Sequence, residues 1–325
     1  MGHARSRILW LLLILALAAI GLWGDRFIIY LTMRVMVLAI FAMGYNVLFG
    51  RTGLLSFGHG AFFACGSYGL ALFSIHINPH PLLCIPAGLI VAAVFSIVIG
   101  YFCVRHTEIY FAMLTLAFGM MVFSLIWNLR DITGGDDGLI GIERAPIDLG
   151  FISIPIHKPE QFFFLVLFFF ALSLWLIHRI LNSPFGLVLS GIRENQQRTE
   201  FAGISVRSYR LAAFVVSGVF SGLAGTLNAM LQNNTDPFSA HWSHSAEPIL
   251  VNLIGGIQTF TGPLAGSAIF ILLQEIIKRY TTYWMFWFGV ILLVIIMGFR
   301  GGVVGVISRL WSRGSRNSSG SGGQS

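Results

Sequence analysis

The chain has 325 residues, of which 56% are hydrophobic and only 10% are charged. A soluble protein carries about 25% charged residues, so this composition excludes a soluble globular domain. The net charge of +7 does not indicate nucleic-acid binding, because Lys and Arg of membrane proteins concentrate in cytoplasmic loops. The sequence therefore predicts an all-α polytopic membrane protein that resides in a lipid bilayer.

Apolar segments follow one another along most of the chain, and one crossing of the bilayer needs about 20 apolar residues. Segments of about this length that precede Glu247 comprise residues 8–23, 28–49, 54–75, 82–104, 109–129, 161–181 and 208–231. Each of them is predicted to form one membrane-spanning helix.

The last apolar region, from Glu247 to residue 299, is interrupted by glycines and Pro263 and again near Lys278. Division at these interruptions gives three short crossings at residues 247–257, 262–278 and 283–299. The alternative is a re-entrant pair of half-helices in place of two crossings. The sequence thus predicts ten transmembrane helices, or alternatively eight, with two glycine-rich broken segments.

Basic residues in short loops set the orientation of a membrane protein. With the N-terminus placed in the cytoplasm, the turns at Arg51 and Arg105 and the arginine-rich block at residues 193–210 also become cytoplasmic. The segment at residues 131–160, in which acids outnumber bases, then lies on the outer side. Both termini are predicted to be cytoplasmic, and 131–160 is predicted to be an external loop.

The chain reads as one transmembrane domain, residues 1–316. The residues after Arg316, NSSGSGGQS, have the composition of a linker, so 317–325 is predicted to be a disordered tail. Three cysteines lie within or beside apolar segments, at positions 65, 84 and 103. An odd number at such positions predicts small packed side chains, not a disulfide framework.

A polar block at residues 193–210 separates two long apolar segments, and its charges cannot lie in hydrocarbon. Ser183 suits the cap of a helix, and Pro184 suits the first helical position. Gly203 is a suitable terminator. These signals predict short, stiff helices on the membrane surface, which a partner protein can push. The alternative is a loop that joins two spans.

Two glycine-rich polar stretches interrupt apolar segments: GRTGLLSFGHG at residues 50–60 and GGIQTFTGPLAG at 255–266. Unwound backbone at membrane depth is tolerated where it is buried in protein or lines a cavity, and paired breaks point to a transport pathway. Tight turns at the membrane surface are the alternative. The residues predicted to lie near a substrate path are Thr52, Ser56, Gly58, Thr261 and Gly262.

Ionisable residues within apolar segments are candidates for function. Glu108, Glu247 and Glu275 lie at or inside such segments, and Glu275 can pair with Lys278 or Arg279 one turn later. A carrier driven by an ion gradient would use a group of this kind. This gives a second class of function, a secondary carrier, beside a permease driven by a partner.

No nucleotide-binding, enzymatic or metal-binding motif is evident in the sequence. The GxxxxGK[ST] phosphate loop is absent, so ATP cannot bind by that device, and no cofactor is expected. His241 and His244 are spaced as neighbours on a helix, but two histidines without a further ligand predict no metal site. The chain is therefore not expected to be an enzyme.

Five motifs occur in a fixed order, and together they carry a resemblance to a known family. They are GRTGLLSFGHGAFFACGSYGLAL, IYFAMLTLAFGMM, ITGGDDGLIGI, NSPFGLVLSGIRENQQRTEFAGI and LIGGIQTFTGPLAGSAI. The chain resembles the permease subunits of bacterial branched-chain amino acid ABC importers, in particular the longer of the two permease types. Importers of urea and short amides use closely similar permeases.

The resemblance implies a permease of the inner membrane that moves its substrate by alternating access. The implied partners are a second permease subunit, two cytoplasmic ATPase subunits that bind ATP, and a periplasmic substrate-binding protein. The segment 183–203 looks like the element that couples the permease to the ATPase. The residues assigned to coupling are Ser183, Pro184, Arg193, Glu194, Arg198, Glu200 and Gly203. The acidic external loop, with Asp136 and Asp137, is expected to receive the binding protein.

Overall fold

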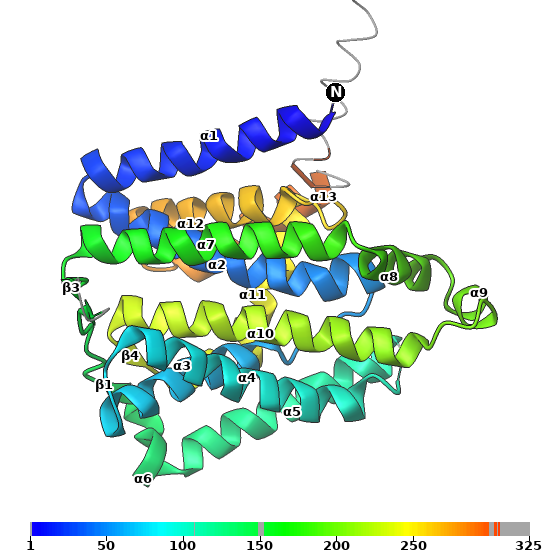
Figure 1. The fold of residues 1–325 in the computed structure, drawn as a ribbon, viewed down its shortest axis with the longest axis horizontal. Coiled ribbons are helices and arrows are strands. Elements are labelled where there is room, and N and C mark those ends of the chain that lie inside the picture. Colours follow the sequence, from blue (N-terminus) through cyan, green and yellow to red (C-terminus); the bar gives the residue numbers. More distant parts are fainter. Residues whose placement is uncertain (1, 107, 149–152, 299–301, 304, 306–325) are drawn as a thin grey trace, which may run out of the picture.

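The computed structural model describes residues 2–106, 108–148, 153–298, 302–303 and 305 (Figure 1). The tail predicted at residues 317–325 lies outside this part of the chain. Ten helices correspond to the ten predicted segments. They are α1 (Gly2–Trp23), α2 (Arg26–Thr52), α3 (His59–His76), α4 (Pro81–Cys103), α5 (Glu108–Asn128), α7 (Pro159–Leu181), α10 (Val206–Gln232), α11 (Trp242–Gly255), α12 (Gly262–Tyr280) and α13 (Trp284–Gly298).

Five of the described helices, α2, α4, α5, α7 and α10, are long and apolar enough to cross a membrane. The chain is therefore an all-α, multi-pass membrane protein, as its composition predicts. Between the long helices lie short elements. They are α6 (Arg130–Thr133), η1 (Gly135–Asp137), β1 (Leu139–Ile140), β2 (Ile147–Asp148), β3 (Ser153–Ile154), α8 (Pro184–Glu194), α9 (Gln196–Phe201), β4 (Asn234–Thr235) and η2 (Pro237–Ala240).

The two ends of the helical bundle differ. Figure 1 shows α8 and α9 projecting from one end, and β1, β3 and β4 at the other. We call these the α8 end and the strand end. The described strands form two short antiparallel pairs, β1 with β4 and β2 with β3.

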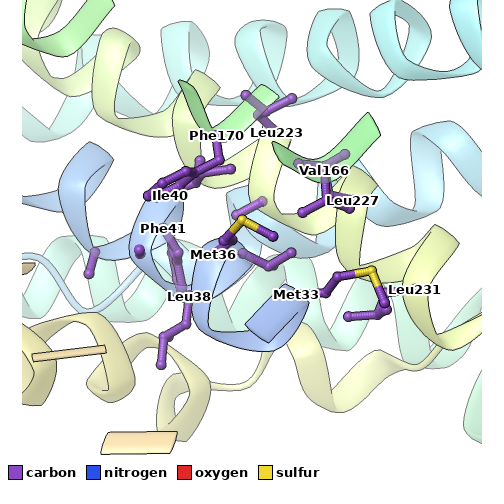
Figure 2. Close-up of a cluster of buried hydrophobic side chains, with 14 of the residues drawn as sticks. Met33, Met36, Leu38, Ile40, Phe41, Val166, Phe170, Leu223, Leu227 and Leu231 are labelled. Atoms are coloured by element: carbon purple, nitrogen blue, oxygen red, sulfur yellow. The ribbon is translucent and has the colours of Figure 1, made fainter. Parts of the chain in front are cut away.

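Helix α2 is the centre of the bundle. Figure 2 shows its side chains Met33, Met36 and Ile40 packed among Val166 of α7 and Leu227 of α10. Because lipid is as apolar as these side chains, close packing contributes more to this core than removal from water does. In the apolar 18-residue stretch of α2, 61% of the residues are buried, and in that of α10, 78% are buried. Both fractions are higher than in α4, α5 and α7.

A stripe of small residues on α10 lets neighbouring helices approach closely. A Cβ atom on Gly225 would lie 1.9 Å from the carbonyl oxygen of Phe63 in α3, and one on Gly222 would lie 2.3 Å from the Cβ of Ala92 in α4. Small residues of this kind are typical where membrane helices meet. The stripe is therefore used for packing within this chain.

Arg144 fixes the loop between β1 and β2 to the strand end of α10. Its Nε and Nη2 atoms donate to the carbonyl oxygens of Met230 and Leu231 at 2.8 and 2.9 Å. The guanidinium also lies 4.5 Å from the centre of the Phe162 ring. Carbonyls at a helix C-terminus lack partners within the helix, and a cation is favourable there. Burial lowers the pKa of Arg144 from its ordinary value.

The start of α3 differs from the sequence expectation of a span from residue 54. Helix α2 ends because Gly53 takes a left-handed conformation with φ of +76°, which favours glycine. Residues 54–58 are not helical, and Leu54, Ser56 and Gly58 are buried. Helix α3 thus begins at His59 inside the protein, after a segment that turns back into the bundle.

Candidate functional site

The projecting element consists of α8 and α9, which meet at Asn195 (Figure 1). Pro184 occupies the first turn of α8, as predicted. Ser183 stands at the cap position, but its Oγ donates to the carbonyl oxygen of Ile180 at 2.7 Å instead of capping α8. The side chain of Asn195 caps α9 by accepting from the Arg198 amide at 2.9 Å. Gly203, with φ of +82°, follows the end of α9.

The outward face of this element combines charge with two apolar side chains. Glu194, Arg198 and Glu200 are exposed. Leu187 is 77% exposed and Phe201 is 91% exposed. Both side chains therefore point away from the bundle. Exposed apolar side chains among charges are typical of a protein interaction site.

The inner face of the element is bound to the transmembrane helices. Leu189 and Ile192 are buried. The guanidinium of Arg193 donates to the carbonyl oxygen of Gly50, in the last turn of α2. Arg210 of α10, which is 6% exposed, donates to the side chain of Gln196 at 2.9 Å. These contacts connect α8 to α2 and α9 to α10.

The segment from Gly53 to Gly58 is held by polar contacts in the interior. The hydroxyl group of Tyr45 donates to the carbonyl oxygen of Ser56 at 3.0 Å and accepts from the Ser56 amide at 3.0 Å. The amide of Phe57 donates to Oγ1 of Thr115 in α5 at 3.2 Å. Backbone groups that no helix satisfies thus find side-chain partners, as burial away from water requires.

His59 closes this polar network. It is completely buried, with Nε2 2.7 Å from Oγ of Ser217 in α10 and Nδ1 2.9 Å from Oγ of Ser56. The next amide, that of Gly60, donates to Oγ of Ser245 in α11 at 2.7 Å. The first turn of α3 therefore meets the first turn of α11 inside the bundle. His59 lies in the predicted break, but a single histidine in an apolar context gave no local signal of these partners.

The second glycine-rich stretch forms the turn between α11 and α12. Gly256 has φ of +115°, and a Cβ on Gly255 would lie 1.8 Å from the carbonyl oxygen of Gly262. The turn lies against the end of α2, because a Cβ on Gly50 would be 2.8 Å from the carbonyl oxygen of Ile257. The glycine-rich stretch at residues 255–266 is thus at the α8 end, whereas the stretch at residues 50–60 reaches into the interior.

The predicted pathway residues consequently fall into two groups. Ser56 and Gly58 lie inside the bundle, where a Cβ on Gly58 would be 2.5 Å from the carbonyl oxygen of Thr115. Thr52, Thr261 and Gly262 belong to the α8 end. The hydroxyl group of Thr52 donates to the carbonyl oxygen of Leu48 at 2.7 Å, and Thr261 is exposed.

The two aspartates expected to meet a binding protein are at the opposite end. Asp136 and Asp137 are exposed in η1, between Gly134 and Gly138, both of which have positive φ. Among the described residues no group of three His, Cys, Asp or Glu side chains is placed to hold a metal ion. His241 instead contacts Ser243, and His244 contacts Glu247.

Comparison with known proteins identifies the family. A family model described as branched-chain amino acid transport system / permease component matches residues 27–299. The chain belongs to this family. The match includes the projecting element, the segment that turns back at Gly53 and the turn between α11 and α12. The resemblance seen in the sequence motifs is thus confirmed.

Relatives from bacteria and an archaeon are similar over most of this permease-family chain. It is 30% identical over 273 residues to the high-affinity branched-chain amino acid transport system permease protein LivM of Escherichia coli (strain K12). The aligned residues make up 78% of this chain and 64% of that protein. The Salmonella typhimurium protein of the same name is 29% identical with the same coverage.

A probable branched-chain amino acid transport permease protein LivM of Methanocaldococcus jannaschii is 24% identical over 250 residues, 74% of this chain and 70% of that protein. The chain spans less than two thirds of the length of the Escherichia coli and Salmonella relatives. No solved structure matches it.

Proposed function

We propose that this chain is the membrane permease subunit of an ABC importer that moves branched-chain amino acids across the bacterial inner membrane. The family match over residues 27–299 is the observation that carries the proposal. The projecting element supports it, since α8 and α9 expose Leu187 and Phe201 and are bonded to α2 and α10. The chain itself is not an enzyme: its family is one of permease components.

The proposed complex contains a second permease subunit, two cytoplasmic ATPase subunits and a periplasmic substrate-binding protein. ATP is bound by the ATPase subunits, and this chain needs no cofactor of its own. In the proposed topology the chain crosses the membrane ten times. Both termini and the α8 end then lie in the cytoplasm, and residues 131–160 lie in the periplasm. In this arrangement Ser56 and Gly58, at the inner break, lie near the substrate path, with Thr52, Thr261 and Gly262 at its cytoplasmic end.

The proposal is tested by uptake in proteoliposomes. The chain is reconstituted with the permease, ATPase and binding protein encoded beside it, and uptake of leucine, urea and a short amide is measured with and without ATP. ATP-dependent leucine uptake is expected. Uptake of urea or amide in its place would change the substrate class, and leucine uptake by this chain alone along an ion gradient would identify a secondary carrier.

Cysteine labelling tests the proposed orientation. A cysteine introduced at Asp137 should react with an impermeant maleimide added from outside, and one introduced at Gln197 should react only after the inner face is opened. The reason is that cytoplasmic loops collect arginine, and Gln197 lies among four arginines whereas Asp137 lies in an acidic segment. The reverse pattern would invert the topology.

Substitution of Asp136 and Asp137 by Asn should weaken the dependence of uptake on ionic strength. Both side chains are exposed on η1, and exposed charges mainly steer the encounter with a partner. We expect slower uptake by about twofold to tenfold at low salt and little change at high salt. The measurement is initial uptake rate against salt concentration. Unchanged rates at every concentration would show that this loop takes no part in capture.

A further inference from the structure

Ionisable side chains from three helices come together near the strand end of the bundle. Arg34 of α2 lies 3.8 Å from the carboxylate of Glu275 and donates to Gln274, both in α12, at 3.0 Å. In α11, Nδ1 of His244 lies 3.4 Å from the carboxylate of Glu247. Arg34 and Lys278 are both near enough to Glu247 to attract it. We call Arg34, His244, Glu247, Glu275 and Lys278 the charged cluster.

The local sequence does not show this arrangement. Glu275 had been expected to pair with Lys278 or Arg279 one turn later, but the cation that it meets is Arg34, from a helix far away in the sequence. Lys278 instead lies 4.4 Å from the centre of the Trp284 ring. The cluster therefore joins α2, α11 and α12 at one level of the bundle.

These charges cannot face lipid. A charged side chain among hydrocarbon costs several kcal/mol, so such residues face protein or a water-filled path. The cluster is nevertheless open, since the side chains of Glu247 and Glu275 are each 36% exposed. The Arg34–Glu275 ion pair at 3.8 Å and the His244–Glu247 contact at 3.4 Å are longer than the usual charge-assisted hydrogen bond of about 2.7–2.9 Å. A ligand with its own charges can thus compete for these groups.

His244 has capacity left for a ligand. Its Nε2 atom is buried and has no hydrogen-bond partner among the described residues. Its ring is stacked on Phe41 at 5.5 Å and meets the edge of Phe63 at 4.6 Å, between ring centres. A buried polar atom without a hydrogen-bond partner is uncommon in folded proteins and therefore needs an explanation. The cluster therefore combines an unsatisfied polar group, aromatic walls and charges of both signs.

The balance of charge indicates the class of ligand. Two basic side chains, Arg34 and Lys278, stand against two carboxylates, Glu247 and Glu275. An anion or a cation alone would satisfy one half of this set and repel the other. A zwitterion presents a carboxylate and an ammonium group together, so it can satisfy both halves of this set.

We propose that the charged cluster holds the α-carboxylate and α-ammonium groups of an amino acid on its way through the permease. The proposal rests on the function proposed above and adds the place and the chemistry of contact. Arg34 and Lys278 receive the carboxylate, and Glu247 and Glu275 receive the ammonium group. The cluster is thus a transient site near the strand end of the path.

A charge-exchange variant distinguishes binding of the substrate by the charged cluster from a purely structural ion pair. In the complete importer, Arg34→Glu is combined with Glu275→Arg, and leucine uptake, ATP hydrolysis and thermal stability are measured. The exchange keeps an ion pair between α2 and α12 but reverses the polarity that a zwitterion meets. We expect stability near that of the parent and leucine moved per ATP reduced at least about tenfold. Parental uptake per ATP would overturn the proposal.

A matched control is available at the first residue of α2. Arg26 and Glu160 form an exposed ion pair at 3.9 Å, close in length to that of Arg34 and Glu275. The same exchange there, Arg26→Glu with Glu160→Arg, should leave leucine moved per ATP unchanged. An equal loss in this control would overturn the assignment to the charged cluster, since it would show that any charge exchange on α2 disturbs transport.

A single neutral substitution keeps the test decisive if the exchanged protein does not fold. Glu247→Gln preserves size and removes one ammonium-binding charge. A purely structural effect lowers uptake and ATP hydrolysis together, whereas loss of a substrate contact lowers leucine moved per ATP. An unchanged ratio would overturn the proposal. Failure of the parent importer to move leucine at all would instead contradict the proposed function.

Discussion

Replacement of both Leu187 and Phe201 by serine should release the ATPase from the permease and lower ATP-driven uptake by at least about a hundredfold. These two side chains are 77% and 91% exposed on the projecting element. Protein interfaces take most of their binding energy from a few large apolar or aromatic side chains, surrounded by polar ones. Large exposed apolar side chains on an otherwise polar element are typical of a docking surface for a partner protein.

The measurement is a pull-down of the ATPase by the permease in detergent, followed by uptake and ATP hydrolysis in liposomes. Ile140 of β1 gives a matched control, because it is 74% exposed at the opposite end of the bundle. Ile140→Ser should bind the ATPase as the parent does. Normal ATPase binding by the Leu187 and Phe201 double variant would show that the docking surface lies elsewhere.

The charged residues of the same surface should contribute less individually. Glu194 and Arg198 are exposed, so solvent screens them before the complex forms. Their combined replacement by alanine is expected to weaken ATPase binding or to uncouple hydrolysis from uptake, since stranding a partner charge at an interface costs about 2–5 kcal/mol. A double variant that binds and transports like the parent would show that both are solvated bystanders.

Local signals in the sequence were sufficient for the ten main helices, apart from the start of α3, but not for the short strands. Runs of apolar residues predicted the long helices, and Pro184 with Gly203 bounded a helical element outside the bilayer. What local pattern cannot supply is the direction of a side chain relative to the rest of the protein. The local sequence therefore did not indicate that Leu187 and Phe201 are turned outward.

For the same reason, the periodicity of the sequence could not predict contacts between distant segments. The sequence placed Arg193 among the docking residues, but its guanidinium reaches the carbonyl oxygen of Gly50 and connects α8 to α2. Glu275 was given a partner one turn away and has one on α2. The glycine-rich stretch at residues 50–60 indicated a break, yet the apolar run from residue 54 still predicted a helix there, because burial in protein and burial in lipid select the same side chains.

Substitution of His59 by leucine should destabilise the permease by about 2–4 kcal/mol and release the segment from Gly53 to Gly58. Leucine fills a similar volume but cannot bond to the hydroxyl groups of Ser56 and Ser217, which the imidazole contacts at 2.9 and 2.7 Å. All three residues are fully buried, so water cannot replace the lost partner. Each stranded polar group then bears the cost of its desolvation.

The effect is measured as thermal unfolding of the purified complex and as the labelling rate of a cysteine placed at Leu55, which leaves the Ser56 hydroxyl group in place. His59→Gln, which keeps a polar group, should recover part of the stability lost in His59→Leu. His76, at the exposed end of the same helix, is the matched control, because its ring contacts the carbonyl oxygen of Leu72 at a site open to solvent. His76→Leu should change stability by less than about 0.5 kcal/mol. Equal melting of His59→Leu and the parent would mean that Tyr45 and Thr115 alone hold the segment, since they provide its other interior contacts.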